Sequence, residues 1–261
     1  MSAIRIFWIG GLISFRALFH WLNPWIYVPT LLVAPLFQIL LFVYVGRAAR
    51  IESDSFFLIG NALQGAAVPC LFAMGHTIAG ERFTQTLGLL LTTPASRVPL
   101  FLGRAAPVVA NGWIVSMFGL GVGGVLVGVD IPPDRWVPLA LVVALASASC
   151  TGLGLINAAL GLKVRQTATF SNIIVGILLV VCGVNVPLAA LPTWLRAVSE
   201  WLPLTHAVEA ARLLADGDTL RSVVPLLGRE AGLAAGFIVV GLVILRAFER
   251  SSRRTASLER Q

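Results

Sequence analysis

The residues that could carry chemistry are few in this chain of 261 residues, and they lie far apart. His20, His76 and His206 fall in three separate regions, whereas metal sites draw on ligands that cluster. Lys163 is the only lysine, and Val164 follows it where a P-loop requires Ser or Thr. The sequence therefore excludes an ATP-binding P-loop in this chain, and it predicts no catalytic residues and no metal site.

The three cysteines also fail to form a recognisable site. Cys70, Cys150 and Cys182 are an odd number, widely spaced, and each lies inside an apolar run. Neither a disulfide framework nor a zinc site has this pattern, so we expect small buried apolar side chains.

The composition indicates a membrane protein. Hydrophobic residues make up 57% of the chain and charged residues 12%, whereas soluble domains carry about 25% charged residues. The net charge is +7, but the basic residues lie in short gaps between apolar runs. That distribution is typical of orientation signals in a membrane protein and not of a nucleic-acid-binding face.

Six apolar stretches are long enough to cross a bilayer, which takes about 20 residues each. The first is preceded by Asn23 and Pro24, which suit the start of a helix. The last must extend back past Arg229 and Glu230, with Arg229 reaching the interface. The predicted spans are 25–46, 56–79, 105–129, 137–162, 166–187 and 226–247.

The remaining segments do not span. Residues 1–24 combine aromatic residues with a narrow basic stripe and predict an amphipathic helix in the membrane interface. Residues 191–228 predict short helices near an interface, and residues 248–261 form a basic tail. With six spans, 12 basic residues lie on the side of the termini and 7 on the other side. The positive-inside rule then places both termini in the cytoplasm.

Uncharged polar residues inside the spans have two interpretations. Ion-coupled transporters keep charged residues at membrane depth, whereas these spans offer only amides apart from His76. The amides can hydrogen-bond between packed helices, or some of them can line a translocation path. The candidate path residues are Asn61, Gln64, Asn111, Asn157 and Asn172.

The stretch after the second span predicts an exposed amphipathic helix. Phe83, Leu87, Leu90 and Leu91 recur at helical spacing, and Pro94 ends the pattern. Such a helix can dock into a groove on a partner protein, or it can lie on the membrane surface.

Two runs of residues resemble ABC-2 type transporter permeases, and the drug-efflux and nodulation-type branch is the most similar. The first run comprises Glu81, Arg82, Phe83, Thr86, Leu87, Leu90, Leu91 and Pro94. The resemblance implies that this run is a coupling helix that inserts into a nucleotide-binding subunit. Gly88 stands where the family often has an acidic residue, so Glu81 or Arg82 would supply the charge.

The second run resembles the block that precedes the last span in the same family. It comprises Asn185, Pro187, Pro192, Trp194, Pro203, Glu209 and Arg212. The resemblance implies short helices that re-enter the outer leaflet. The expected fold is an all-α membrane protein with six transmembrane helices, an N-terminal interfacial helix, a cytoplasmic coupling helix and these re-entrant helices.

The resemblance implies the permease subunit of an ABC exporter in a bacterial inner membrane, moving a drug, antibiotic, lipid or polysaccharide. The chain itself binds no cofactor, because ATP and Mg²⁺ belong to the partner ATPase subunit. The expected partners are that subunit and a second permease, identical or similar, and no nucleic acid. A passive channel or scaffold would need no ATPase, and an intramembrane enzyme would need clustered reactive groups.

Overall fold

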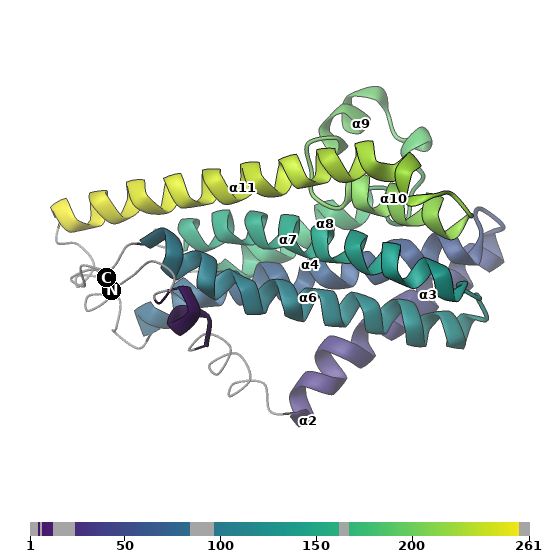
Figure 1. Cartoon of the computed structure of the whole chain (residues 1–261), viewed down its shortest axis with the longest axis horizontal. Coiled ribbons are helices and arrows are strands. Elements are labelled where there is room, and N and C mark those ends of the chain that lie inside the picture. Colours follow the sequence, from purple (N-terminus) through teal and green to yellow (C-terminus); the bar gives the residue numbers. More distant parts are fainter. Residues whose placement is uncertain (1–4, 6, 13–23, 84–96, 162–166, 256–261) are drawn as a thin grey trace.

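The structure is a computed structural model that describes residues 5, 7–12, 24–83, 97–161 and 167–255 (Figure 1). Helices and the turns between them account for these residues, and no strand occurs among them. The all-helical prediction is therefore confirmed for the described part of the chain.

The helices follow the apolar stretches of the sequence. α2 begins at Pro24, as expected for a proline in a first helical turn. It continues through a π-helical segment, η1, into α3, so that Trp25–Ala49 forms one long helical segment. The helices are α2 (Pro24–Tyr27), η1 (Val28–Val33), α3 (Ala34–Ala49), α4 (Asp54–Phe83), α6 (Arg97–Val127), η2 (Pro133–Arg135), α7 (Trp136–Leu160), α8 (Thr167–Val181), η3 (Leu188–Ala190), α9 (Thr193–Ser199), α10 (Thr205–Ala215) and α11 (Leu220–Thr255).

In the described part of the chain, five helical segments are long and apolar enough to cross a membrane: Trp25–Ala49, Asp54–His76, Val98–Val127, Pro133–Leu160 and Leu220–Phe248. They correspond to the first, second, third, fourth and sixth predicted spans. The fifth predicted span contains α8, an apolar helix of 15 residues. At 1.5 Å per residue α8 is about 22 Å long, against a hydrocarbon core of about 30 Å. The count of six spans thus remains a prediction at α8.

α4 lies in the middle of the bundle. It packs against α3, α6, α7 and α8, and α11 runs along α7 (Figure 1). The short helix α10 lies at one end of the bundle, where it contacts α4, α7 and α11. We call this end the α10 end; α4 begins there, and α11 begins close to it. The opposite end, where α4 ends and α6 begins, we call the 83–97 end.

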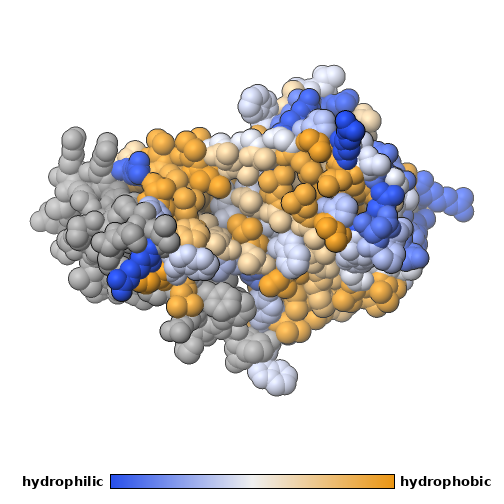
Figure 2. All heavy atoms as spheres, in the orientation of Figure 1, coloured by the Kyte–Doolittle hydropathy of each residue, from blue (hydrophilic) through white to orange (hydrophobic). Residues whose placement is uncertain are grey.

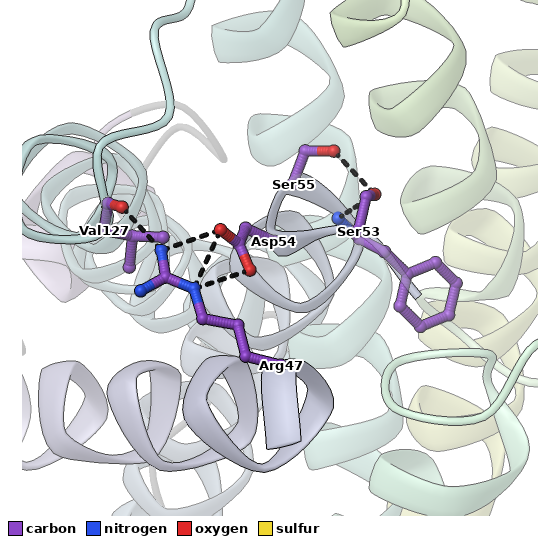
Figure 3. A network of polar contacts seen from close by, with 6 residues as sticks. Arg47, Ser53, Asp54, Ser55 and Val127 are labelled. Atoms are coloured by element: carbon purple, nitrogen blue, oxygen red, sulfur yellow. Dashed lines mark hydrogen bonds and ion pairs between the residues drawn. The ribbon is translucent and has the colours of Figure 1, made fainter. Parts of the chain in front are cut away.

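A polar contact closes the turn between α3 and α4 at the α10 end (Figure 3). Arg47 on α3 forms an ion pair with Asp54 on α4 at 2.7 Å. The same guanidinium donates to the backbone oxygen of Val127 at 2.9 Å, at the end of α6. Arg50 ends α3 in the left-handed conformation, with φ of 52°. Arg47 thus holds the end of α3, the start of α4 and the end of α6 together at a partly exposed position.

The surface is largely apolar along the bundle, and polar residues gather at the α10 end (Figure 2). Large hydrophobic side chains such as Phe37, Val125 and Val243 are more than half exposed. A soluble monomer rarely exposes so continuous an apolar surface, whereas a lipid-facing one requires it. The chain is an integral membrane protein.

The N-terminal residues 7–12 are helical and lie against the first turns of α6. Gly11 and Gly103 allow this close approach, since a Cβ on Gly103 would lie 2.3 Å from the backbone oxygen of Phe7. Trp8 is 70% exposed on this segment. Its place in the membrane interface remains a prediction.

Candidate functional site

The residues predicted to couple to an ATPase belong to the 83–97 end. Glu81, Arg82 and Phe83 are the last three residues of α4. Thr86, Leu87, Leu90, Leu91 and Pro94 lie outside the described residues. α4 leads into this segment and α6 leads out of it at the end of the bundle opposite α10 (Figure 1). The docking helix itself remains a prediction.

The second predicted run builds the α10 end. Its prolines stand where short helices begin: Pro187 precedes η3, Pro192 precedes α9 and Pro203 lies just before α10. Proline fixes φ near the helical value and has no N–H to satisfy, so it suits these starts. Trp194 on α9 is 67% exposed and Glu209 on α10 is also exposed. The segment thus forms short helices as predicted, whereas its re-entry into the outer leaflet remains a prediction.

Arg212 joins α10 to two other parts of the bundle. Its Nη1 donates to the backbone oxygen of Gly183 at 2.8 Å, and its Nη2 donates to that of Val184 at 3.0 Å. Nη2 also donates to the backbone oxygen of Phe56 on α4 at 3.0 Å. Guanidinium offers five N–H groups in a rigid plane, so one side chain can satisfy several carbonyls at once. Arg212 therefore fixes the turn after α8 and the start of α4 relative to α10.

Gly60 makes this arrangement possible. A Cβ at this position of α4 would lie 2.3 Å from the backbone oxygen of Val184 and 2.8 Å from Nη2 of Arg212. Gly183 has φ of 73°, a conformation that favours glycine, and it turns the chain back after α8. The backbones of α4 and the turn after α8 therefore approach closely only because these positions lack side chains.

A chain of amides continues from this turn into the bundle. Asn185 accepts a hydrogen bond at 2.7 Å from Nδ2 of Asn61, which is buried on α4. Oδ1 of Asn61 accepts a hydrogen bond at 3.1 Å from Nε2 of Gln38 on α3. The three amides connect α3, α4 and the turn after α8. Asn185, from the run that resembles the block before the last span, and Asn61, from the candidate path residues, are thus brought together.

The other candidate path residues are dispersed. Gln64 donates to the backbone oxygen of Val175 on α8 at 3.1 Å. Asn111 accepts a hydrogen bond at 2.6 Å from the hydroxyl of Tyr27, and Asn157 donates to Ser171 at 2.7 Å. Asn172 is exposed on α8. Each of the three buried amides therefore joins two helices in this conformation, and the five residues do not share one surface.

Glu230 is a residue that sequence reasoning missed. Its side chain is fully buried on α11, whereas its neighbour Arg229 is exposed. The spans therefore contain a buried acid in addition to amides, contrary to the sequence prediction. A signal was present: Glu230 lies seven residues after Val223 and four before Ala234, which are both buried. Helical spacing thus places it on the face that packs against the bundle.

Among the described residues, the three thiols and the histidines His76 and His206 form no recognisable reactive site. Cys70, Cys150 and Cys182 are buried free thiols. His76 is exposed on α4 and His206 is buried on α10. No group of three His, Cys, Asp or Glu side chains among the described residues could hold a metal ion. The polar residues of this part of the chain hold helices to one another and to backbone carbonyls.

Comparison with known proteins gives one informative match. A family model described as ABC-2 type transporter matches residues 12–214. The match includes α2 to α9, nearly all of α10, and the whole segment from residue 81 to residue 94. No curated protein matches the chain.

Proposed function

Because the chain belongs to the ABC-2 type transporter family, we propose that it is the permease subunit of an exporter driven by a separate ATPase. Permeases of this family are membrane components without an ATPase site, and they normally work with an ATP-binding subunit. The lack of a P-loop in the sequence agrees with this division of labour.

The observation that carries the proposal is the course of α4. It begins at the α10 end beside Arg212 and ends at the 83–97 end, where α6 begins. α4 is thus a continuous helix of 30 residues between the proposed docking segment and the polar cluster around Arg212. A displacement of that segment by an ATPase would be transmitted along α4 to the opposite end.

The proposed docking surface is the apolar face formed by Phe83, Leu87, Leu90 and Leu91. An amphipathic helix lays such a face into a groove of its partner. The partner would bind ATP and Mg²⁺, and closure of its nucleotide-bound form would supply the free energy that shifts the permease between inward-facing and outward-facing states.

A second permease chain completes the proposed transporter. In the most apolar 18-residue stretch of each span, only 11% of the first span and 17% of the last span are buried within the chain. The corresponding value for the second span is 78%. The first and last spans thus offer most of the surface that lipid or an identical or similar chain would cover.

The proposed cargo is an amphipathic or lipid-linked molecule, such as a drug, antibiotic, lipid or polysaccharide precursor, that leaves a bacterial cytoplasm or inner leaflet. Paths for bare ions are commonly lined by rings of charged side chains or carbonyls. The described spans combine apolar side chains with dispersed amides and one buried acid, Glu230, rather than a ring of charges, which suits a mixed apolar and polar cargo better.

The experiment is a pull-down of the tagged chain in mild detergent from its native membrane, followed by an ATPase assay on the eluate. We expect a P-loop subunit to co-purify with the wild type and to be lost in Leu87→Asp. Leu89→Asp is the matched control, because it makes the same change on the opposite side of the predicted helix.

Three outcomes are distinguishable. Loss of the subunit in Leu87→Asp alone supports docking through the apolar face. Loss in both variants would indicate that a charge anywhere in the segment is not tolerated, as for a helix on the membrane surface. If no P-loop subunit is found even after cross-linking in the membrane, the exporter proposal fails, and a passive channel or scaffold becomes the hypothesis to test.

A further inference from the structure

Glu230 lies in the seam between α7 and α11. Its side chain is fully buried, and along α11 it follows Val223 and precedes Ala234 and Leu245 on the same buried face. α7 and α11 pack closely here: a Cβ on Gly152 would lie 3.2 Å from the backbone oxygen of Ala234. A carboxyl group in an otherwise apolar seam is costly unless hydrogen bonds compensate its burial.

The compensating donors come from two other elements. Oε1 of Glu230 accepts a hydrogen bond from the hydroxyl of Ser149 on α7. It also accepts one at 3.0 Å from the backbone N–H of Leu204, the residue before α10. Ser149 and Leu204 are themselves fully buried. The carboxyl group therefore connects α7, α10 and α11 at one point.

The bond to Leu204 fixes the start of α10. Leu204 has φ of 78°, and no side chain at this position caps the first turn of α10. The N–H groups at a helix start attract negative charge, and they are normally satisfied by a capping side chain close in sequence. Here the carboxyl group that accepts from the helix start comes from α11.

Other ionisable side chains of the packed elements lie near the carboxyl group. They are His206 on α10, Cys150 on α7 and Cys182 at the end of α8, and all three are buried. Cys182 donates to the backbone oxygen of Pro203 at 3.3 Å, which adds a second link to the turn before α10.

α10 is thus fastened at two places to different parts of the bundle. Glu230 holds its first turn to α7 and α11, and Arg212 holds its last turn to α4 and to the turn after α8. We infer that Glu230 is a positioning residue that makes α10 move with α11 as one unit when the α10 end opens and closes. The joint movement of α10 and α11 rests on the proposed export function. The hydrogen bonds by which Glu230 holds α10 do not depend on that function.

The test measures distances between pairs of spin labels in the full-length chain. The reporting pair is Glu209→Cys on α10 with Gly232→Cys on α11; both positions are exposed, and a Cβ at Gly232 meets no atom within 4 Å. The reference pair is Val125→Cys on α6 with Val137→Cys on α7, at exposed positions. The native cysteines are buried and stay in place.

We expect Glu230→Ala to broaden the distance distribution of the reporting pair at least twofold and to leave the reference pair unchanged. Glu230→Gln keeps an acceptor for Leu204 and Ser149, so it should broaden the distribution less. The matched control Arg229→Ala, at the neighbouring exposed position, should have no effect. An unchanged reporting pair in Glu230→Ala, or equal broadening of both pairs, would overturn the inference.

The same labels test the motion in the complex with its ATPase, trapped with ATP, Mg²⁺ and vanadate. The reporting distance should stay the same in the wild type with and without trapping, and it should change on trapping in Glu230→Ala. A change in the wild type itself would show that α10 and α11 move separately. If no ATPase is found even after cross-linking in the membrane, the export proposal fails, and the labels in the isolated chain still decide whether Glu230 holds α10.

Discussion

Arg212 and Phe56 make two contacts across the α10 end. The guanidinium carbon of Arg212 lies 3.5 Å from the centroid of the Phe56 ring, and Nη2 donates to the Phe56 backbone oxygen at 3.0 Å. A desolvated cation–π contact contributes about 2 kcal/mol, so this pair is a strong link between α10 and α4. It contrasts with the ion pair of Arg47 and Asp54, which is exposed to solvent and therefore contributes little to stability.

The first prediction concerns Arg212. Arg212→Ala removes the donor from the carbonyls of Gly183 and Val184 in the turn after α8, whereas the carbonyl of Phe56 keeps its bond within α4; each buried acceptor without a partner costs about 1–3 kcal/mol. We expect a loss of at least about 2 kcal/mol in the free energy of unfolding. Arg212→Lys should lose about half as much, because one ammonium cannot reach all three oxygens.

The measurement is unfolding of the purified chain in detergent with increasing denaturant. Arg221→Ala, at an exposed position of the first turn of α11, is the control and should change stability by about 0.5 kcal/mol or less. If Arg212→Lys were as stable as the wild type, the planar geometry of the guanidinium would not be the important property.

The second prediction concerns the close approach at Gly60. Gly60→Ala places a Cβ 2.3 Å from the backbone oxygen of Val184, which requires α4 and the turn after α8 to separate. Such overpacking costs about 1–3 kcal/mol. The control Gly176→Ala, on α8, meets no atom within 4 Å and should stabilise the helix by up to about 1 kcal/mol. We expect the two variants to change the stability in opposite directions in the same thermal unfolding assay. Changes in the same direction would contradict the close contact at Gly60.

The third prediction is an energetic coupling between Asn61 and Asn185. Their hydrogen bond is 2.7 Å long, and a double-mutant cycle with Asn61→Ala and Asn185→Ala should give a coupling of about 1 kcal/mol. Asn157 lies near the C-terminal end of α7 and donates a hydrogen bond to Ser171 instead. The pair Asn61→Ala and Asn157→Ala should therefore be additive, and coupling of similar size in both pairs would contradict a local interaction.

The sequence predicted the order of the long helices well, because apolar length determines where they lie, and five of the six predicted spans correspond to helices long enough to cross a membrane. The predicted first span, 25–46, is contained in Trp25–Ala49, and the predicted fourth, 137–162, lies within two residues of α7. The helices α6 and α11 extend beyond the predicted spans, to Arg97 and Thr255. The predicted spans were ended at charged residues, whereas the helices continue past those residues.

The predictions were weaker where tertiary contacts decide the conformation. The predicted span 166–187 continued beyond Val181, where α8 ends, because residues 182–187 are also mostly apolar. In the structure Gly183 turns the chain, and Arg212 binds the carbonyls of this turn. The burial of Glu230 likewise depends on donors from Ser149 and Leu204, which are distant in sequence. Helical spacing can place Glu230 on the buried face of α11, but no local sequence pattern identifies the partners of Arg212 or Glu230.

The last prediction concerns orientation, on which the proposed function depends. Of the 19 basic residues, 12 lie in the segments assigned to the 83–97 end and 7 in those assigned to the α10 end. The basic residues Arg246, Arg250, Arg253 and Arg254 belong to the last turns of α11, at the other end. The positive-inside rule then places the α10 end outside and the 83–97 end in the cytoplasm.

Single cysteines and a membrane-impermeant maleimide test this orientation in intact cells. Asp134→Cys, whose native side chain is 71% exposed, should be labelled directly, and Ser252→Cys in the last turns of α11 only after the membrane is permeabilised. The buried native thiols should give little background. The reverse pattern would place residues 81–94 outside the cell, where no ATP-hydrolysing subunit could reach them, and it would contradict the proposed coupling.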